Sequence, residues 1–302
     1  MMLFDKKLYL NLINLYFKYF PINKGKYRIL NFLLNISKDT SKKYIISSKD
    51  GRKFNADLNE PMYKGVFCTG FYEKHETEIV KKIIKEGDVT FDIGANFGWY
   101  TTLFATLVGK TGSVHSFEPV PSIFDQLKHN VEINDLNDGV ILNDFALGAE
   151  EGQTTLHLFK GLPSGHASIS DLGRDDYVQY QIPIMTLDKY IFDKGITKVD
   201  FVKCDVEGAE MMVIKGATHL FSSNNPPIIL VEMNITTSNL FGYKPEDPLK
   251  EIQKLNEYKF FKVINGKKIK ELERLNIYEN GDNILCLPKA KNNILIDDIV
   301  QR

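Results

Sequence analysis

The fold of this chain is predicted by residues 89–102, whose sequence is Val-Thr-Phe-Asp-Ile-Gly-Ala-Asn-Phe-Gly-Trp-Tyr-Thr-Thr. The first five residues are rich in β-branched and aromatic side chains and predict a buried strand. Gly94 and Gly98 allow the backbone to turn sharply and to approach a ligand closely. The apolar run that follows predicts a helix. A strand, a glycine loop and a helix N-terminus in this order form the nucleotide-binding corner of an open α/β sheet.

The glycine spacing excludes two common phosphate-binding motifs. Three residues separate Gly94 from Gly98, whereas the dinucleotide fingerprint is G-x-G-x-x-G. Trp99 follows Gly98, where a P-loop would need a lysine. Asp92, near the end of the predicted strand, would repel a pyrophosphate. The carboxylate suits S-adenosylmethionine (SAM), which carries a sulfonium, an ammonium and a ribose but no phosphate.

Two motifs resemble the FkbM family of class I SAM-dependent methyltransferases. The first is D-I-G-A-N-F-G-W-Y-T from Asp92, in which Asn96 stands where many relatives have glycine. The second follows the family pattern D-x-x-K-x-D-x-E-G-x-E, with its polar positions at Asp200, Lys203, Asp205, Glu207, Gly208 and Glu210. The resemblance implies a Rossmann-like α/β fold with a mostly parallel sheet of seven strands, the last antiparallel.

The resemblance also implies which residues bind SAM. Glu118 ends the next predicted strand, 24 residues after Gly94, and is placed to accept both ribose hydroxyls. Asp144 is expected to accept from the adenine amino group, with Phe145 against the ring. Tyr72 and Glu73 resemble a family Tyr-Glu pair, although acids near a helix N-terminus are also common for dipole reasons. The full expected set is Tyr72, Glu73, Asp92, Gly94, Ala95, Asn96, Gly98, Trp99, Thr101, Glu118, Pro119, Asp144, Phe145, Ala146 and Asp205.

The expected catalytic groups are Asp205, Glu207, Glu232 and His166, of which the last lies in a Gly/Ser/Pro loop. A hydroxyl nucleophile must lose its proton, which a carboxylate or histidine can accept. Alternatively, Asp205, Glu207 and Glu232 would hold a divalent cation that lowers the hydroxyl pKa. The cation is not favoured, because no His or Cys ligand spacing accompanies these acids.

Residues 1–60 are expected to form a helical and hairpin cap, and residues 61–302 the methyltransferase domain. Residues 1–60 carry twelve Lys/Arg against five Asp/Glu, and the remainder 26 against 34. Aromatic and basic residues within 1–40 suggest peripheral contact with a membrane or a partner, although simple packing on the domain also explains them. The net charge of −1 gives no drive toward nucleic acid. Three dispersed cysteines and the lack of a signal-peptide pattern favour a cytoplasmic protein.

The expected function is O-methylation of a hydroxyl by SAM, with a sugar or glycan as the first acceptor class. FkbM relatives methylate hydroxyls of polyketides and sugars, so a small natural product is the second class, and an amine acceptor the third. A SAM-binding protein without turnover and a dinucleotide oxidoreductase are the alternatives from other classes. The oligomeric state is not predicted.

Overall fold

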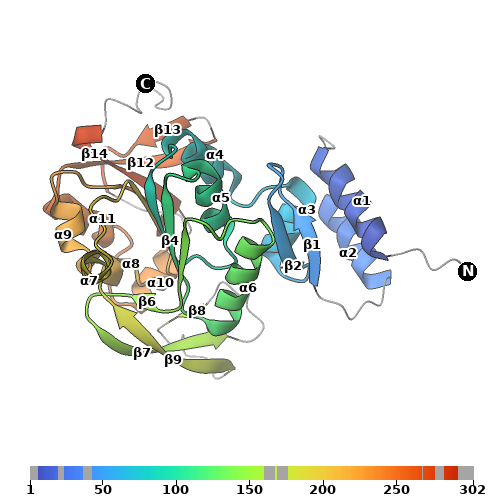
Figure 1. Cartoon of the computed structure of the whole chain (residues 1–302), viewed down its shortest axis with the longest axis horizontal. Coiled ribbons are helices and arrows are strands. Elements are labelled where there is room, and N and C mark those ends of the chain that lie inside the picture. Colours follow the sequence, from blue (N-terminus) through green and yellow to red (C-terminus); the bar gives the residue numbers. More distant parts are fainter. Residues whose placement is uncertain are drawn as a thin grey trace, which may run out of the picture.

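The computed structural model describes residues 6–19, 24–36, 43–159, 167–168, 176–266, 268–275 and 282–291. Within these residues the main sheet has eight strands in the order β13-β12-β14-β11-β10-β3-β4-β5 (Figure 1). Its strands are β3 (Val89–Ile93), β4 (Ser113–Phe117), β5 (Val140–Asn143), β10 (Phe201–Cys204), β11 (Ile228–Met233), β12 (Tyr258–Asn265), β13 (Lys268–Glu271) and β14 (Asp282–Pro288).

Strand directions confirm the predicted α/β sheet. Neighbours from β11 through β10, β3 and β4 to β5 run parallel. β14 inserts antiparallel between β11 and β12. The short, charged β13 was not predicted as a strand; it pairs antiparallel with β12 and adds an eighth strand at the edge.

Helices cover both faces of the sheet. On one side lie α4 (Lys74–Ile83), α5 (Trp99–Val108) and α6 (Pro121–Glu132); on the other lie α7 (Leu187–Asp193), α8 (Glu210–Lys215), α9 (Thr218–Ser222) and α11 (Asp247–Leu255). Successive residues of β10 pack into opposite cores: Phe201 lies on the α4 and α5 side, and Val202 lies on the α8 and α11 side. Both faces of β10 are therefore buried, as expected for a parallel strand covered by helices on both sides.

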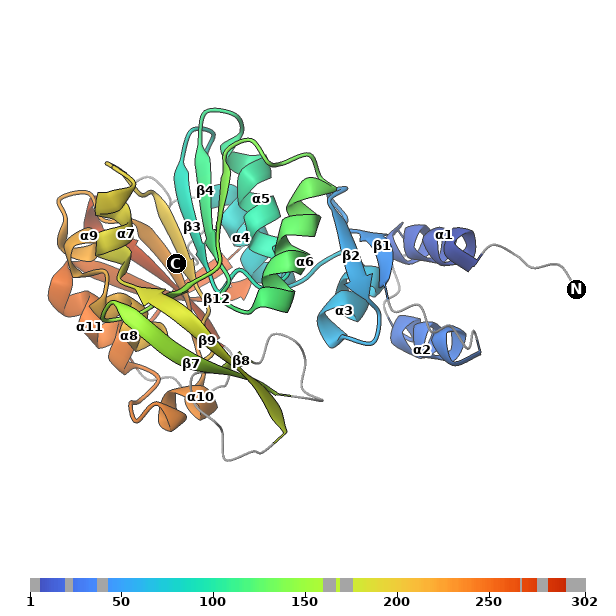
Figure 2. The same cartoon turned by 60° about the horizontal axis from the view of Figure 1, so that its bottom comes forward.

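A second sheet follows β5, in the order β6-β9-β7-β8. It consists of β6 (Ala146–Leu147), β7 (Gly152–Phe159), β8 (Ala167–Ser168) and β9 (Tyr177–Met185). Strands β7 and β9 pair antiparallel along their length. Figure 2 shows this sheet below the carboxyl ends of the main strands.

The N-terminal elements lie at one end of the molecule, opposite α9 and α11 (Figures 1 and 2). They are α1 (Lys6–Tyr19), α2 (Lys26–Ile36), the antiparallel hairpin of β1 (Lys43–Ser47) and β2 (Lys53–Asp57), and α3 (Pro61–Thr69). The two helices and the hairpin agree with the sequence prediction, whereas α3 was not predicted. The division into a cap and a domain at residue 60 stays a prediction.

Backbone conformation and side-chain capping set the starts of two helices. Helix α8 begins at Glu210, because Glu207 adopts a left-handed backbone conformation with φ 51° that interrupts helix geometry. Helix α10 (Ile235–Leu240) begins directly after Asn234, whose side chain caps its N-terminus. A 3-10 turn, Lys289–Lys291, follows β14.

Candidate active site

The register of the parallel strands places the predicted acids in one row. Ile93 lies opposite both Phe117 and Cys204 in neighbouring strands, and Cys204 lies opposite Val231. The next residues along these strands are Gly94, Glu118, Asp205 and Glu232. Because these positions are level, one edge of the sheet carries the glycine loop and three carboxylates, where open α/β sheets bind their ligands.

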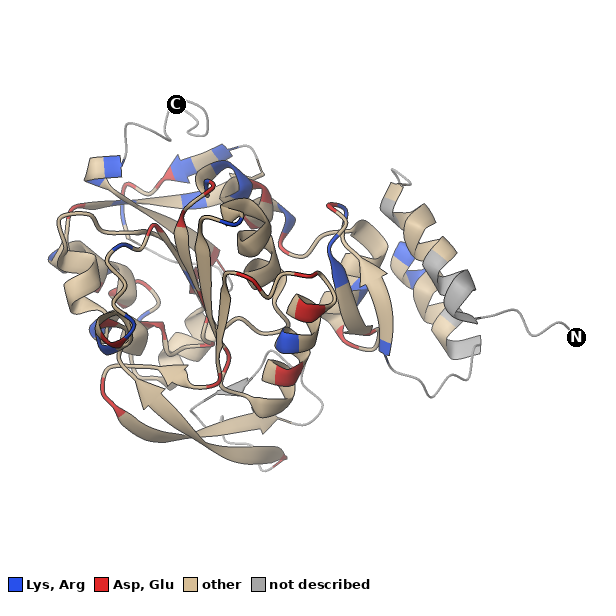
Figure 3. Ribbon diagram, viewed as in Figure 1, with Lys and Arg blue, Asp and Glu red and all other residues tan. Residues whose placement is uncertain are grey.

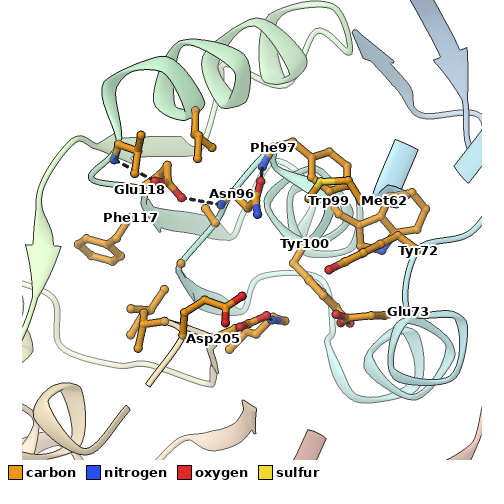
Figure 4. A pocket seen from close by; sticks show the side chains of 18 of the residues that line it. Met62, Tyr72, Glu73, Asn96, Phe97, Trp99, Tyr100, Phe117, Glu118 and Asp205 are labelled. Carbon is orange, nitrogen blue, oxygen red and sulfur yellow. Dashed lines mark hydrogen bonds and ion pairs between the residues drawn. The ribbon is translucent and has the colours of Figure 1, made fainter. Parts of the chain in front are cut away.

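A cavity of about 540 Å³ opens at this edge (Figure 4). That size lies in the usual range for small-molecule sites. Predicted residues that line it are Tyr72, Glu73, Gly94, Ala95, Asn96, Trp99, Glu118, Pro119, Phe145, Ala146, Asp205 and Glu207. Further lining residues come from α2, α3 and β7, among them Tyr27, Met62 and Leu156.

The glycine loop has its shape because two backbones approach closely. Gly94 has φ 80°, and a Cβ built on it would lie 1.8 Å from the backbone oxygen of Asp205. Gly98 has φ 86°, and its Cβ would lie 2.6 Å from a methyl of Leu127 in α6. Asn96 also adopts a left-handed conformation, which asparagine tolerates better than most residues. Glycine is therefore required at both ends of the loop.

Glu118 is held in place by the backbone of the same cavity wall. Its Oε2 accepts from the backbone N–H of Asn96 at 3.0 Å, and its Oε1 accepts from that of Val120 at 2.9 Å. The side chain is only 6% exposed, and burial raises its pKa to about 7, even though both backbone donors favour the charged form. The carboxylate is thus fixed before any ligand arrives, with further acceptor capacity on each oxygen.

Asp92 lies behind the cavity wall rather than in it. It is 1% exposed, and its Oδ2 accepts from the Thr101 hydroxyl at 2.6 Å. That hydroxyl also lies 2.9 Å from the Ser116 hydroxyl on the neighbouring strand. Burial raises the pKa of Asp92 to about 6, while Lys203 lowers it. The described geometry makes Asp92 a group that ties β3 to α5 and β4; direct contact of Asp92, Thr101 or Gly98 with a cofactor stays a prediction.

Asp205 forms an ion pair with a lysine that the expected site did not include. Lys203 is 2% exposed, and its Nζ lies 2.6 Å from Asp205 Oδ2 and 4.7 Å from the ring centroid of Tyr100. Burial alone would lower the pKa of Lys203, but nearby carboxylates, first Asp205 and then Glu73, raise it above its ordinary value. Tyr100 donates its hydroxyl to Glu73 at 2.7 Å. Lys203 therefore stays charged and orients the Asp205 carboxylate.

Glu207 and Glu232 lie beside Asp205. One carboxylate oxygen from each of the three residues lies within 4.8 Å of the others. The adjacent Asp205 carboxylate, together with burial and a hydrogen bond between the two side chains, raises the pKa of Glu232 to about 11. Three carboxylates offer hard oxygen ligands for a divalent cation. Without a cation, Glu232 is protonated and donates to Asp205.

The opposite end of the cavity is apolar. Phe145, Ala146 and Leu147, which follow β5, line the cavity together with Leu156 from β7. Asp144, expected to accept from adenine, is exposed and lies outside the lining, so its role stays a prediction. His166 falls outside the described residues, and its expected role as a base stays a prediction too.

Sequence patterns contained a signal for Lys203 but not for the distant lining residues. A lysine inside the apolar strand Phe201–Cys204 is unusual, since lysine is rarely buried without a partner. Tyr27, Met62 and Leu156 lie far from the motifs in sequence. Only the packing of α2, α3 and β7 against the sheet edge brings them to the cavity.

More than half of the chain is similar in sequence to known methyltransferases. Residues 92–261, more than half of the chain, match the model of the methyltransferase FkbM domain. The hexuronic acid methyltransferase AglP of Haloferax volcanii is 26% identical over 193 residues, covering 62% of this chain and 76% of that protein. The 31-O-demethyl-FK506 methyltransferase FkbM of Streptomyces tacrolimicus is 27% identical over 192 residues, covering 54% of this chain and 70% of that protein.

A methyltransferase FkbM from Methylobacillus flagellatus superposes with a TM-score of 0.44 at 13% identity, covering 74% of this chain and 52% of that chain. A SAM-dependent O-methyltransferase from Thermotoga maritima gives a TM-score of 0.39 at 14% identity, covering 84% of this chain and 80% of that chain.

Proposed function

The chain belongs to the FkbM methyltransferase domain family and is a SAM-dependent methyltransferase, and we propose that it methylates a hydroxyl of a sugar or glycan. The observation that carries the proposal is the single cavity shared by Glu118, the glycine loop and Asp205. Glu118, the proposed cofactor-binding acid, and Asp205, a strand-end carboxylate that can receive a proton, thus line the same cavity. Figure 4 shows Glu118 and Asp205 on either side of it.

The residues present fit SAM. Glu118 offers a fixed, buried carboxylate to the two ribose hydroxyls, and charge-assisted hydrogen bonds of this kind are strong. Phe145 and Leu156 give the flat, apolar surroundings that an adenine ring needs. No basic residue apart from Lys203 lines the cavity among the described residues, and Lys203 is paired with Asp205. That charge pattern suits a sulfonium ligand better than a phosphate.

When bound, SAM supplies a methyl group on its sulfonium sulfur. The methyl group passes to the acceptor oxygen by in-line displacement, with the sulfur as the leaving atom. The chain must hold the acceptor hydroxyl opposite the leaving sulfur, and positioning supplies much of the rate. Asp205 is the proposed base for the hydroxyl proton. Lys203 fixes the orientation of its carboxylate, and Glu232 donates a hydrogen bond from the neighbouring strand. A correctly positioned base contributes about 10²- to 10⁴-fold to such a reaction.

The sugar class is supported by the aromatic end of the cavity and by one relative. Tyr27, Phe71 and Tyr72 line the end next to α2 and α3, and aromatic rings stack well on sugar faces. AglP is named a hexuronic acid methyltransferase. The second candidate acceptor is the hydroxyl of a polyketide-type product, because the relative named for FK506 is equally similar and the cavity has an apolar end.

The test combines calorimetry of SAM binding with transfer of labelled methyl groups to panels of sugars and polyketide alcohols. Micromolar SAM binding with transfer to a sugar supports the proposal. Transfer only to polyketide alcohols would favour the second candidate, and an absence of SAM binding would refute the placement of the cofactor.

The carboxylate cluster needs its own experiment. We propose that the reaction needs no metal, since the Lys203 ammonium, 2.6 Å from the Asp205 carboxylate, already neutralises that acid. Turnover is therefore expected to persist in EDTA and to gain little from added Mg²⁺. Loss of turnover in EDTA, restored by Mg²⁺ while SAM affinity stays constant, would assign Asp205, Glu207 and Glu232 as cation ligands instead.

A further inference from the structure

The two N-terminal helices expose an unusual amount of apolar surface. In α1, Leu12, Leu15, Tyr16 and Tyr19 follow i, i+3, i+4 and i+7 spacing and are 52–66% exposed. The outer apolar face is defined here as these four residues together with Ile29 and Phe32 of α2, which are 50% and 63% exposed. Several large apolar side chains exposed at helical spacing mark an interaction site more often than scattered single residues do.

The sides of α1 and α2 that lie opposite the outer apolar face are packed against the protein. On the opposite side of α1, buried Asn14 donates to the backbone oxygen of Phe67 in α3 at 3.0 Å. Phe17 packs edge-on against the Phe67 ring at 6.1 Å between centroids. In α2, Leu30 is fully buried and Lys26 donates to the backbone oxygen of Phe17. The exposed stripe is thus the side that remains after α1 and α2 have packed.

The charged residues of these two helices are all basic. Their sequences are KKLYLNLINLYFKY and KYRILNFLLNI, with five Lys/Arg and no Asp or Glu. Figure 3 shows blue but no red on their coloured parts. Leucine, tyrosine and basic residues without acids are the composition of helices that lie in the interface of an anionic membrane.

We propose that α1 and α2 dock the enzyme on an anionic lipid surface, lying in the plane of the interface with the outer apolar face among the headgroups. At ~1.5 Å per residue, helices of 14 and 11 residues are about 21 and 17 Å long, which is shorter than the ~30 Å hydrocarbon core. No helix in the described residues has the length and apolarity to cross a membrane. Binding in the plane of the interface is therefore the geometry that these helices allow.

The docking surface adjoins the active-site cavity. Tyr27 belongs to α2 and also lines that cavity, together with Pro61 and Met62 of α3. The next step rests on the proposed function, in which the acceptor binds at the aromatic end of the cavity. Docking of α2 would place that end beside the lipid surface, so the acceptor class is a hydroxyl carried by a lipid-anchored molecule. A second copy of the chain is a poorer occupant, because it would bring the same net-positive helices, and α1 and α2 contain no acid to pair with them.

The test is co-sedimentation of the full chain with vesicles of phosphatidylcholine alone and of phosphatidylcholine mixed with phosphatidylglycerol. We expect binding to the anionic vesicles only, reduced about tenfold or more in Leu12→Ser/Leu15→Ser/Tyr16→Ser, since each change removes exposed apolar surface. Phe192→Ser is the matched control, because Phe192 is 83% exposed on α7, away from these helices. It should bind as the parent does.

Three results would overturn the proposal: no vesicle binding, equal binding by the triple variant, or equal binding to both kinds of vesicle. A dimer on gel filtration that the triple variant converts to a monomer, with no vesicle binding, would assign the face to self-association. SAM calorimetry on the same samples separates this outcome from failure of the proposed function, since cofactor binding needs no vesicle.

Discussion

Replacement of Glu118 by glutamine tests the cofactor site most directly. Glutamine keeps the size of the side chain but removes its charge. Wild-type Glu118 accepts from two backbone N–H groups, those of Asn96 and Val120. In Glu118→Gln the amide nitrogen must face one of these donors, and only one oxygen remains to accept from the ribose.

Two opposing effects on stability should nearly cancel. A donor left without an acceptor costs about 1–3 kcal/mol. Burial raises the pKa of Glu118 from near 4.5 to about 7, and above pH 7 this shift lowers the stability of the folded state by roughly 3 kcal/mol. The cost is absent below pH 4.5, where the carboxyl is protonated in both the folded and the unfolded state. Glutamine, which is never charged, removes the cost. The melting temperature at pH 8 should therefore change little. Loss of one charge-assisted bond, about 1.5–3 kcal/mol, should weaken SAM binding roughly 10- to 100-fold.

The assay is titration calorimetry with SAM at pH 8, with Glu150→Gln as the control because Glu150 is exposed and outside the cavity. The control should bind as the parent does. SAM affinity of Glu118→Gln within twofold of the parent, with an unchanged melting temperature, would refute the assignment of Glu118 to the ribose.

The pH dependence of SAM affinity should also differ between the parent and Glu118→Gln. Because the pKa of Glu118 is about 7, the parent carboxyl is mostly protonated near pH 6 and mostly ionised near pH 8. Parental SAM affinity should rise about tenfold over this range, since the ionised form is the better acceptor. Glu118→Gln should show a flat profile, so that the two proteins converge at low pH. Parallel profiles would show that another group governs the pH dependence.

Three further perturbations follow from the site. Asp205→Asn should keep SAM affinity within a few-fold and lower single-turnover methyl transfer about 10²- to 10⁴-fold; an unchanged rate would remove Asp205 as the base. Gly94→Ala should destabilise the fold by more than about 2 kcal/mol in urea unfolding, because its Cβ would collide with the Asp205 backbone oxygen, whereas Gly51→Ala, with similar positive φ but open space, should lose only about 1 kcal/mol. Equal losses would show that φ alone sets the cost. Asp144→Asn should weaken SAM binding about tenfold if its carboxylate accepts from adenine, and parental affinity in calorimetry would exclude that role.

Local sequence was enough to predict the central elements. The stretch 89–102 contains its own strand, loop and helix signals, because apolar periodicity and glycine act over a few residues. The acids after three parallel strands could be expected at one edge for the same reason: strand ends are visible in sequence and parallel strands align their carboxyl ends. Elements without such signals were missed, namely α3 and the short strand β13.

By itself the sequence determined the reaction class and the row of Gly94, Glu118 and Asp205, since these depend on motifs within single strand ends. Tertiary structure decided the rest. In the folded chain Asp92 is buried against Thr101 behind the cavity wall and does not line the cavity. Packing also brings Leu156 and Tyr27 to the cavity from elements that are distant in sequence. The pKa values of Glu118 and Glu232 also belong to the fold, because desolvation and the nearness of another carboxylate exist only once separate strands have packed side by side.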